Sequence, residues 1–328
     1  MTGATPRPLA SRAAEGAGRA GGPTRRRVVL GAVGAVASMS ALTGCGWRLD
    51  LPQPPPPVPT RRPAPDEQFV IGVLAELRAL VAAAGTVSPD ESRRSALRAT
   101  VTVLERQVVV LTGRLTNAGV PSSVITVAPA APSTPTVSPS TTVAASEVDG
   151  FADVLASFAP ARWQSLAATS ADTRDLVLAA WSARLACAVR LGASVEPSSA
   201  PSRARAAIAT HTSPLVYAFE VVAAQSSGRR RSTAAHTLSQ LRGLDLAVSG
   251  GGAATPGGWS LPFPVTAAAA AQRLGDTVLA AAVDAVVDVA GPAPDAAALE
   301  DAARWSARVQ SIATGWGMPP TPFPGART

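Results

Sequence analysis

The chain has 328 residues, with 29 basic and 22 acidic side chains and a net charge of +7. All of the basic side chains are arginine, and six of them lie with one acid in residues 1–44, so the rest of the chain has 23 basic and 21 acidic groups, or +2. This near balance excludes a nucleic-acid-binding protein with a broad basic face. The two cysteines, Cys45 and Cys187, are too few for a disulfide framework or a cysteine-based zinc site.

The N-terminal segment has the order of parts that is typical of a secretory signal peptide, over residues 1–44. Arg25, Arg26 and Arg27 precede an apolar run, residues 28–41, that is only about half as long as a membrane-spanning helix. Small residues then lead to Leu-Thr-Gly-Cys45, which resembles a bacterial lipobox. The resemblance implies that Cys45 receives a diacylglyceryl group, and that the protein is exported and lipid-anchored to the outer face of the cytoplasmic membrane.

Two questions about this segment stay open. An ordinary cleaved signal or a weakly hydrophobic membrane helix would show a similar pattern of charge and apolar residues. The arginines resemble a twin-arginine (Tat) export signal, although valine stands where that signal favours an aromatic residue. We favour the Tat route over the Sec route, and Tat export implies folding before export.

The chain after the signal is predicted to begin with a spacer. Residues 45–65 form a proline-rich tether, and such a composition favours extended polyproline II. Residues 66–119 have apolar residues at three- and four-residue spacing in two runs and predict a helical hairpin, whose second helix is capped by Ser88 and starts at Pro89. Residues 120–146 carry no charge, are rich in Pro, Ser and Thr, and predict a disordered linker that is open to O-glycosylation in an exported protein.

Helical periodicity resumes at residue 147. Residues 147–200 predict a helical segment that packs on the bundle that follows it, with its stronger helix at 172–192. Residues 201–325 predict a bundle of further helices, one of them kinked at Pro214. No convincing strand pair is evident, so the predicted fold class is all-α. The helices of the bundle are expected at 202–226, 229–248, 266–290 and 295–316.

Further expectations concern packing. Cys187 lies among apolar residues and is expected to be a small buried hydrophobe. The run Arg229, Arg230 and Arg231 is expected to be a solvated helix start rather than a phosphate-binding patch. The predicted core residues are Trp181, Leu185, Val189, Leu215, Val216, Phe219, Val222, Leu238, Leu241, Val278, Leu279, Val283 and Val286.

Several landmarks recur in one order in residues 201–325. They are Tyr217-Ala-Phe219, His236 with Arg242, the loop from Trp259 to Val265, Leu299-Glu300 with Trp305, and Phe323-Pro-Gly325. This order resembles the actinobacterial DUF4439 domain, a ferritin-like four-helix domain of no assigned activity. The resemblance implies a helical bundle and does not imply a reaction.

A ferritin-like bundle raises the question of a two-metal site. Such proteins place a glutamate on each of two helices and Glu-x-x-His on each of the other two. The sequence has no Glu-x-x-His, and its two histidines, His211 and His236, are expected to be structural, the latter packing on an adjacent helix or bonding to Tyr217. Glu220 is a candidate that would face inward, but it lacks partner ligands.

The aspartates Asp276, Asp284 and Asp288 form the best acidic series. They are expected to face solvent, because the apolar residues of their helix lie on the other side. We therefore predict no metal site, no cofactor and no catalytic residue, and Cys45 is the residue to which we assign a chemical role.

Two classes of function remain. The first is a non-enzymatic helical binding or structural protein of the cell envelope. It would have membrane lipid as a partner through Cys45, and an envelope protein or a small apolar ligand as a further partner, but no nucleic acid. The alternative is a divergent ferritin-like metal-binding or redox protein whose ligands are not recognisable in the sequence. Metal analysis of the purified protein separates the two.

Overall fold

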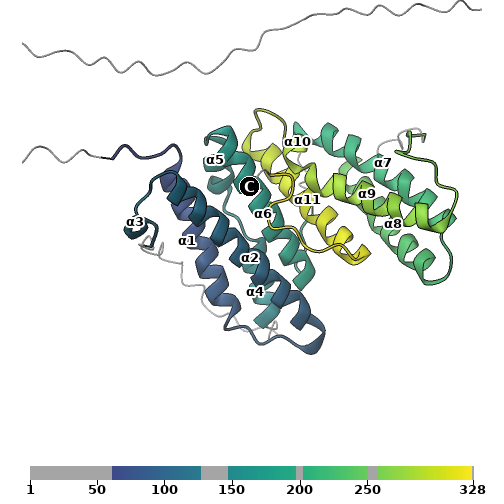
Figure 1. Ribbon diagram of the computed structural model, residues 1–328, viewed down its shortest axis with the longest axis horizontal. Helices are drawn as coiled ribbons and strands as arrows, with labels where there is room; N and C mark the ends of the chain where they lie inside the picture. The colour runs from purple at the N-terminus through teal and green to yellow at the C-terminus, as the bar shows by residue number, and fades with distance from the viewer. Residues whose placement is uncertain (1–60, 127–146, 197–201, 250–257, 327–328) are drawn as a thin grey trace, which may run out of the picture. The chain divides into compact units, whose positions relative to one another are not determined.

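A computed structural model describes residues 61–126, 147–196, 202–249 and 258–326 of the chain (Figure 1). Within these ranges all regular structure is helical, which confirms the all-α fold class. The signal peptide, most of the tether, residues 127–146 of the charge-free linker and the glycine-rich loop at 250–257 lie outside the described residues. The prediction of disorder is wrong for residues 120–126 of that linker, because they include helix α3 and the buried side chains of Val120 and Ile125. The helices that precede residue 200 are α1 (Glu67–Ala84), α2 (Glu91–Asn117), α3 (Ser122–Thr126), α4 (Glu147–Ala156), α5 (Pro160–Ala167) and α6 (Ala171–Leu191). Those that follow are α7 (Ala204–Gln225), α8 (Gly228–Ser249), α9 (Ala268–Asp284), α10 (Val286–Ala290) and α11 (Ala296–Trp316).

Two helices, α6 and α11, lie at the centre of the described part. Helix α6 packs against α2, α4, α5, α10 and α11, and α11 packs in addition against α7, α8 and α9 (Figure 1). Every residue of α6 from Leu176 to Ala188 is buried. A helix that is apolar on nearly all sides has to lie inside the molecule, so the sequence of α6 places it there.

The core contains the residues that the sequence predicts. All of them are buried except Val189, Val216 and Val278, which are half-buried and pack against the core. Cys187 is also buried, as predicted. Burial raises the pKa of its thiol to about 11, although the hydroxyl of Thr100 and the charge of Arg190 oppose this shift, so the side chain is an uncharged thiol at neutral pH.

Two predicted helix limits are wrong. Helix α2 begins at Glu91 and not at Pro89, because Asp90 is its N-cap and accepts a 2.9 Å hydrogen bond from the backbone N–H of Arg93. The backbone N–H of Ser88 instead donates to the distant Glu147. The single helix expected at 266–290 is two helices, because the backbone leaves helical geometry at Ala285.

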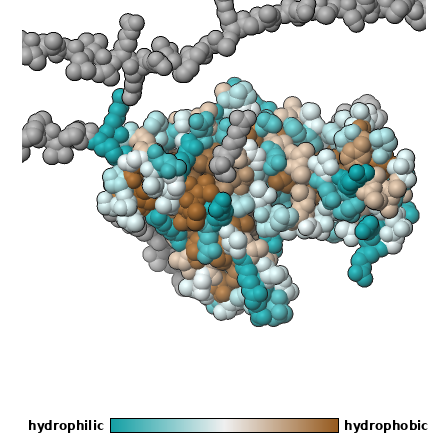
Figure 2. Space-filling model, in the orientation of Figure 1, coloured by the Kyte–Doolittle hydropathy of each residue, from teal (hydrophilic) through white to brown (hydrophobic). Residues whose placement is uncertain are grey.

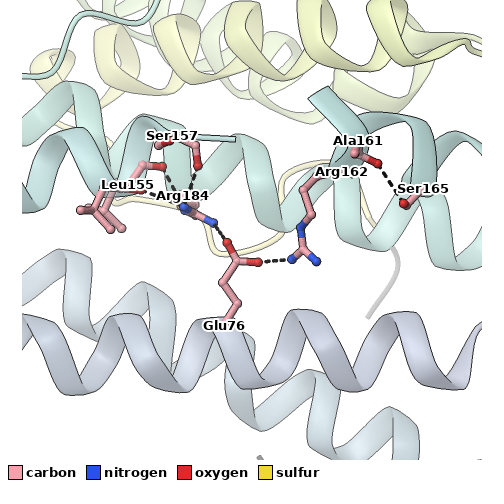
Figure 3. Close-up of polar contacts among 8 residues, drawn as sticks. Glu76, Leu155, Ser157, Ala161, Arg162, Ser165 and Arg184 are labelled. Carbon is pink, nitrogen blue, oxygen red and sulfur yellow. Dashed lines mark hydrogen bonds and ion pairs between the residues drawn. The ribbon is translucent and has the colours of Figure 1, made fainter. Parts of the chain in front are cut away.

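The charged side chain inside α6 is Arg184, whose side chain is only 3% exposed. Its guanidinium donates to three carbonyls at the end of α4, those of Val154, Leu155 and Ser157, and lies 2.5 Å from Glu76 of α1 (Figure 3). The last carbonyls of a helix have no partner within the helix. The guanidinium of Arg184 supplies hydrogen-bond donors to these carbonyls of α4, and the carbonyls and Glu76 in turn stabilise its buried charge. Burial lowers the pKa of Arg184 and the carboxylate of Glu76 opposes this shift.

Glu76 also forms an ion pair with a second guanidinium, which comes from another helix. Its other carboxylate oxygen pairs with Arg162 of α5 (Figure 3). Aromatic rings surround the two arginines: Phe158 lies 4.2 Å from the guanidinium carbon of Arg184, and Trp181 lies 5.6 Å from that of Arg162. One carboxylate of α1 therefore ties α4, α5 and α6 together through two arginines.

We predict that Glu76→Ala lowers the free energy of unfolding by about 2 kcal/mol, because it leaves the buried guanidinium of Arg184 without a counter-charge. Urea denaturation followed by circular dichroism measures the change. Glu105→Ala is the matched control, since Glu105 is exposed on the neighbouring helix α2, and a surface substitution of this kind changes stability by about 0.5 kcal/mol or less. Equal effects of the two substitutions would contradict the role given to Glu76.

Candidate functional site

A cavity of about 550 Å³ lies where four segments meet. These segments are the end of α2, the start of α6, the junction of α9 and α10, and residues 325–326. The volume lies in the range of small-molecule sites, about 300–1,000 Å³. The charged side chains that line it are Arg114, Asp172, Asp175, Asp284 and Asp288. The cavity is therefore markedly acidic.

Two of the carboxylates come from the start of α6. Asp172 and Asp175 are three residues apart on this helix and so lie on one face of it. An acid in the first turn of a helix is favourable because the N-terminal end of the helix dipole is positive, which explains Asp172 without any ligand. It does not explain Asp175, which lies beyond the first turn beside a second carboxylate.

The other two carboxylates lie where α9 ends. Asp284 is the last residue of α9 and Asp288 lies in α10, one turn further on. A carboxylate at the C-terminal end of a helix is electrostatically unfavourable. Helix stability therefore gives no reason for an acid at position 284.

Residues 325–326 form one wall of the cavity, and the segment 322–325 that leads into this wall is held by two contacts. The side-chain amide of Gln107 on α2 donates to the carbonyl oxygen of Pro322 at 2.9 Å, and the backbone N–H of Gly325 donates to Oδ1 of Asp284 at 3.2 Å. Gly325 has a φ of +67°, and a Cβ atom on it would overlap the backbone carbonyl of Asp284. This position therefore requires glycine for two reasons, backbone conformation and space.

The pKa of Asp175 is shifted upward from its ordinary value. Burial raises the pKa of Asp175, the neighbouring Arg174 lowers it, and the negative charge of Asp172 raises it further. The net shift is upward, which means that the ionised form of Asp175 is disfavoured in the absence of a ligand. A cation in the cavity would stabilise that ionised form.

The structure brings together only part of the predicted acidic series. Asp284 and Asp288 line the cavity, whereas Asp276 lies elsewhere and accepts hydrogen bonds from the indole N–H of Trp316 at 2.7 Å and from Gln272 at 3.0 Å. All three aspartates are exposed, as predicted. Three further residues that line the cavity were not predicted from the sequence, namely Arg114, Asp172 and Asp175. The spacing of the two aspartates was a visible signal, but an acid near a helix start has an ordinary structural explanation.

The other candidate ligands are dispersed. Glu220 does not face inward: it is exposed, and its carboxylate pairs with Arg242 at 2.8 Å. His236 is exposed as well, and within the described residues it has no hydrogen bond to Tyr217, whose ring instead packs against Trp259. His211 is half-buried, with its ring 6.1 Å from that of Trp305. In the described ranges no group of three or more His, Cys, Asp or Glu side chains could hold a metal ion.

Exposed large apolar side chains stand on separate helices. Val109 on α2, Val154 on α4 and Leu246 on α8 are 58%, 51% and 64% exposed. Figure 2 shows brown areas mainly over the half that holds α1 and α2, broken by hydrophilic residues. Single exposed apolar residues are ordinary in globular proteins, so the cavity is the stronger candidate for a binding site.

The described part of the chain is all-helical and contains an acidic cavity. No family model, no curated protein and no solved structure matches the chain. Among the described helices, none is long and apolar enough to cross a membrane. Cys45 and the arginines Arg25, Arg26 and Arg27 lie outside the described residues.

We predict that Gly325→Ala lowers the free energy of unfolding by about 2 kcal/mol. A positive φ costs alanine roughly 1 kcal/mol, and the new Cβ atom also displaces the cavity wall from Asp284, which adds a further cost. Gly119→Ala is the control, because Gly119 also has a positive φ, of +78°, but open space around its Cβ position. Thermal unfolding compares the two variants. If they are equally destabilised, the close approach to Asp284 contributes nothing.

Proposed function

We propose that this protein is an exported lipoprotein whose helical body binds a ligand in the cell envelope and catalyses no reaction. The support for export and anchoring is the order of the arginines, the apolar run and the lipobox-like Leu-Thr-Gly-Cys45. The proline-rich tether at 45–65 then serves as a spacer between the lipid and the helices. The Tat route is proposed for export because of Arg25, Arg26 and Arg27.

We also propose that α7, α8, α9 and α11 form a ferritin-like four-helix bundle related to the DUF4439 domain. The packing supports this, because α11 contacts the other three helices and α7 contacts both α8 and α9. The acid inside this group is Asp301, which is fully buried, and its carboxylate lies 3.7 Å from Arg205. An arginine therefore stands beside the interior carboxylate, which favours a binding or structural role over the alternative of a metal or redox protein.

The observation that carries the proposed binding function is the acidic cavity. Four carboxylates from two separate parts of the chain face one volume of about 550 Å³, and Arg114 is the one basic group among the described residues that line it. This composition favours a small organic cation over a small apolar ligand. Amine groups spaced along a flexible chain, as in a polyamine, can approach carboxylates on both sides of such a cavity.

We predict that the protein binds spermidine, used as a probe, with saturable affinity that weakens as salt is added, because salt screens the attraction between charges. Isothermal titration calorimetry measures this binding. Asp175→Asn with Asp288→Asn removes one carboxylate from each side and is expected to weaken binding about tenfold or more.

Asp153→Asn is the control for that experiment, since Asp153 is exposed on α4 and outside the cavity lining. It is expected to leave the affinity unchanged within about twofold. Absence of saturable binding, or an equal loss in the control, would overturn the proposed site.

Membrane attachment has a separate test. Cys45→Ala removes the thiol that would be acylated, and two acyl chains are enough for stable anchoring. We predict that cell fractionation finds the unsubstituted protein in the membrane fraction and the Cys45→Ala variant outside it. A Cys187→Ala variant is the control, because the Cys187 thiol is buried, and it should stay in the membrane fraction. Retention of the Cys45→Ala variant in that fraction would overturn the lipoprotein assignment.

A further inference from the structure

A second charged feature lies at the start of α8. Arg229, Arg230 and Arg231 follow Gly228, the first residue of the helix, and all three are exposed. Within the described residues, no carboxylate lies within the 4.0 Å ion-pair distance of any of them. Many other arginines of the molecule do have such a partner, among them Arg162 and Arg184.

Helix stability does not explain this run. The N-terminal end of a helix carries the positive end of its dipole, so cations there are unfavourable and anions are favourable. Three adjacent guanidinium groups also repel one another. The run therefore costs stability unless an anion binds to it.

The structure places a hollow beside two of these arginines. It has a volume of about 190 Å³ and is lined by Arg229, Arg230, Thr233, Gln272 and Trp316. The hollow combines side chains of α8, α9 and α11, which lie far apart in the sequence. This combination is the reason to revise the expectation of a merely solvated helix start.

The indole of Trp316 is a fixed wall of that hollow. Its N–H donates to Oδ1 of Asp276 at 2.7 Å, and its ring packs edge-on against Phe219 with 5.2 Å between the centroids. Gly275 leaves room for the ring, since a Cβ atom there would lie 2.8 Å from the indole. The Oδ1 atom of Asp276 also accepts a hydrogen bond from Gln272, so it is already engaged within the protein.

We propose that Arg229, Arg230 and the wall formed by Trp316 make a binding site for a phosphate group. A guanidinium binds phosphate oxygens through two parallel N–H donors, which an ammonium does not offer. Two guanidiniums match the charge of a phosphate. The group belongs either to an anionic lipid headgroup or to a free phosphate.

A lipid source would orient the molecule. Gln272 lines the hollow and Asp284 lines the acidic cavity, and both are on α9. Their separation along the helix axis is about 18 Å at 1.5 Å per residue. Docking of the arginines on an anionic surface would thus keep the acidic cavity at the other end of α9, away from that surface.

Vesicle co-sedimentation tests the proposal with the chain from residue 45 onward, which contains all the described helices and carries Cys45→Ala so that no acyl chain contributes. Vesicles of phosphatidylcholine with phosphatidylglycerol are compared with vesicles of phosphatidylcholine alone. Inorganic phosphate is titrated in parallel by calorimetry. The variant is Arg229→Gln with Arg230→Gln, and the control of equal charge change is Arg98→Gln with Arg106→Gln, two exposed residues of α2.

We expect the Arg229→Gln, Arg230→Gln variant to bind its ligand about tenfold more weakly or worse, while the control keeps its affinity. The loss is expected for anionic vesicles if the phosphate belongs to a lipid, and for inorganic phosphate if the phosphate is free. Circular dichroism and thermal melting check that both proteins stay folded. Binding to neither probe, or equal losses in the variant and the control, would overturn the proposal. These outcomes are independent of spermidine binding, so either site can fail without the other.

Discussion

The burial of α6 on nearly all sides sets the arrangement of the helices around it. From Leu176 to Ala188 this helix has no side that faces water, and an unpaired charge in such a place is very costly. Arg184 is the charged residue in that stretch, so its guanidinium must find partners inside the protein. It finds them in the last carbonyls of α4 and in Glu76 of α1. These contacts connect α1 and α4 to the buried stretch of α6.

The acidic cavity lies where this packing ends. Asp172 and Asp175 stand on the first turns of α6, before its fully buried stretch begins, and Asp284 stands where α9 gives way to α10. At such ends the side chains leave the core and can gather around a shared volume without losing hydration entirely. The buried residues at the centre of the molecule thus stabilise the fold, while side chains at the helix ends are available for binding.

The sequence predicts the positions of the helices better than the contacts between them. The all-α class and nearly all of the predicted core follow from apolar spacing, because each helix must bury one stripe. The N-cap of α2 was misplaced because Ser88 and Asp90 are both residue types that favour the N-cap, and only the structure shows that Asp90 accepts from the N–H of Arg93. The cavity was missed because its side chains come from separate parts of the chain. Asp175 and Asp284 are distant in sequence, and no periodicity within one helix reveals that they share a site.

The contact between Gln107 and Pro322 has a consequence for the order in which the molecule forms. These residues are 215 positions apart, and the amide of Gln107 is fully buried in α2. Until residue 322 has been synthesised, one donor of that amide lacks its partner and the cavity lacks the wall that carries Gly325. The helices can begin to assemble while the chain still emerges from the ribosome, but the acidic cavity is completed only after translation has passed its last wall segment.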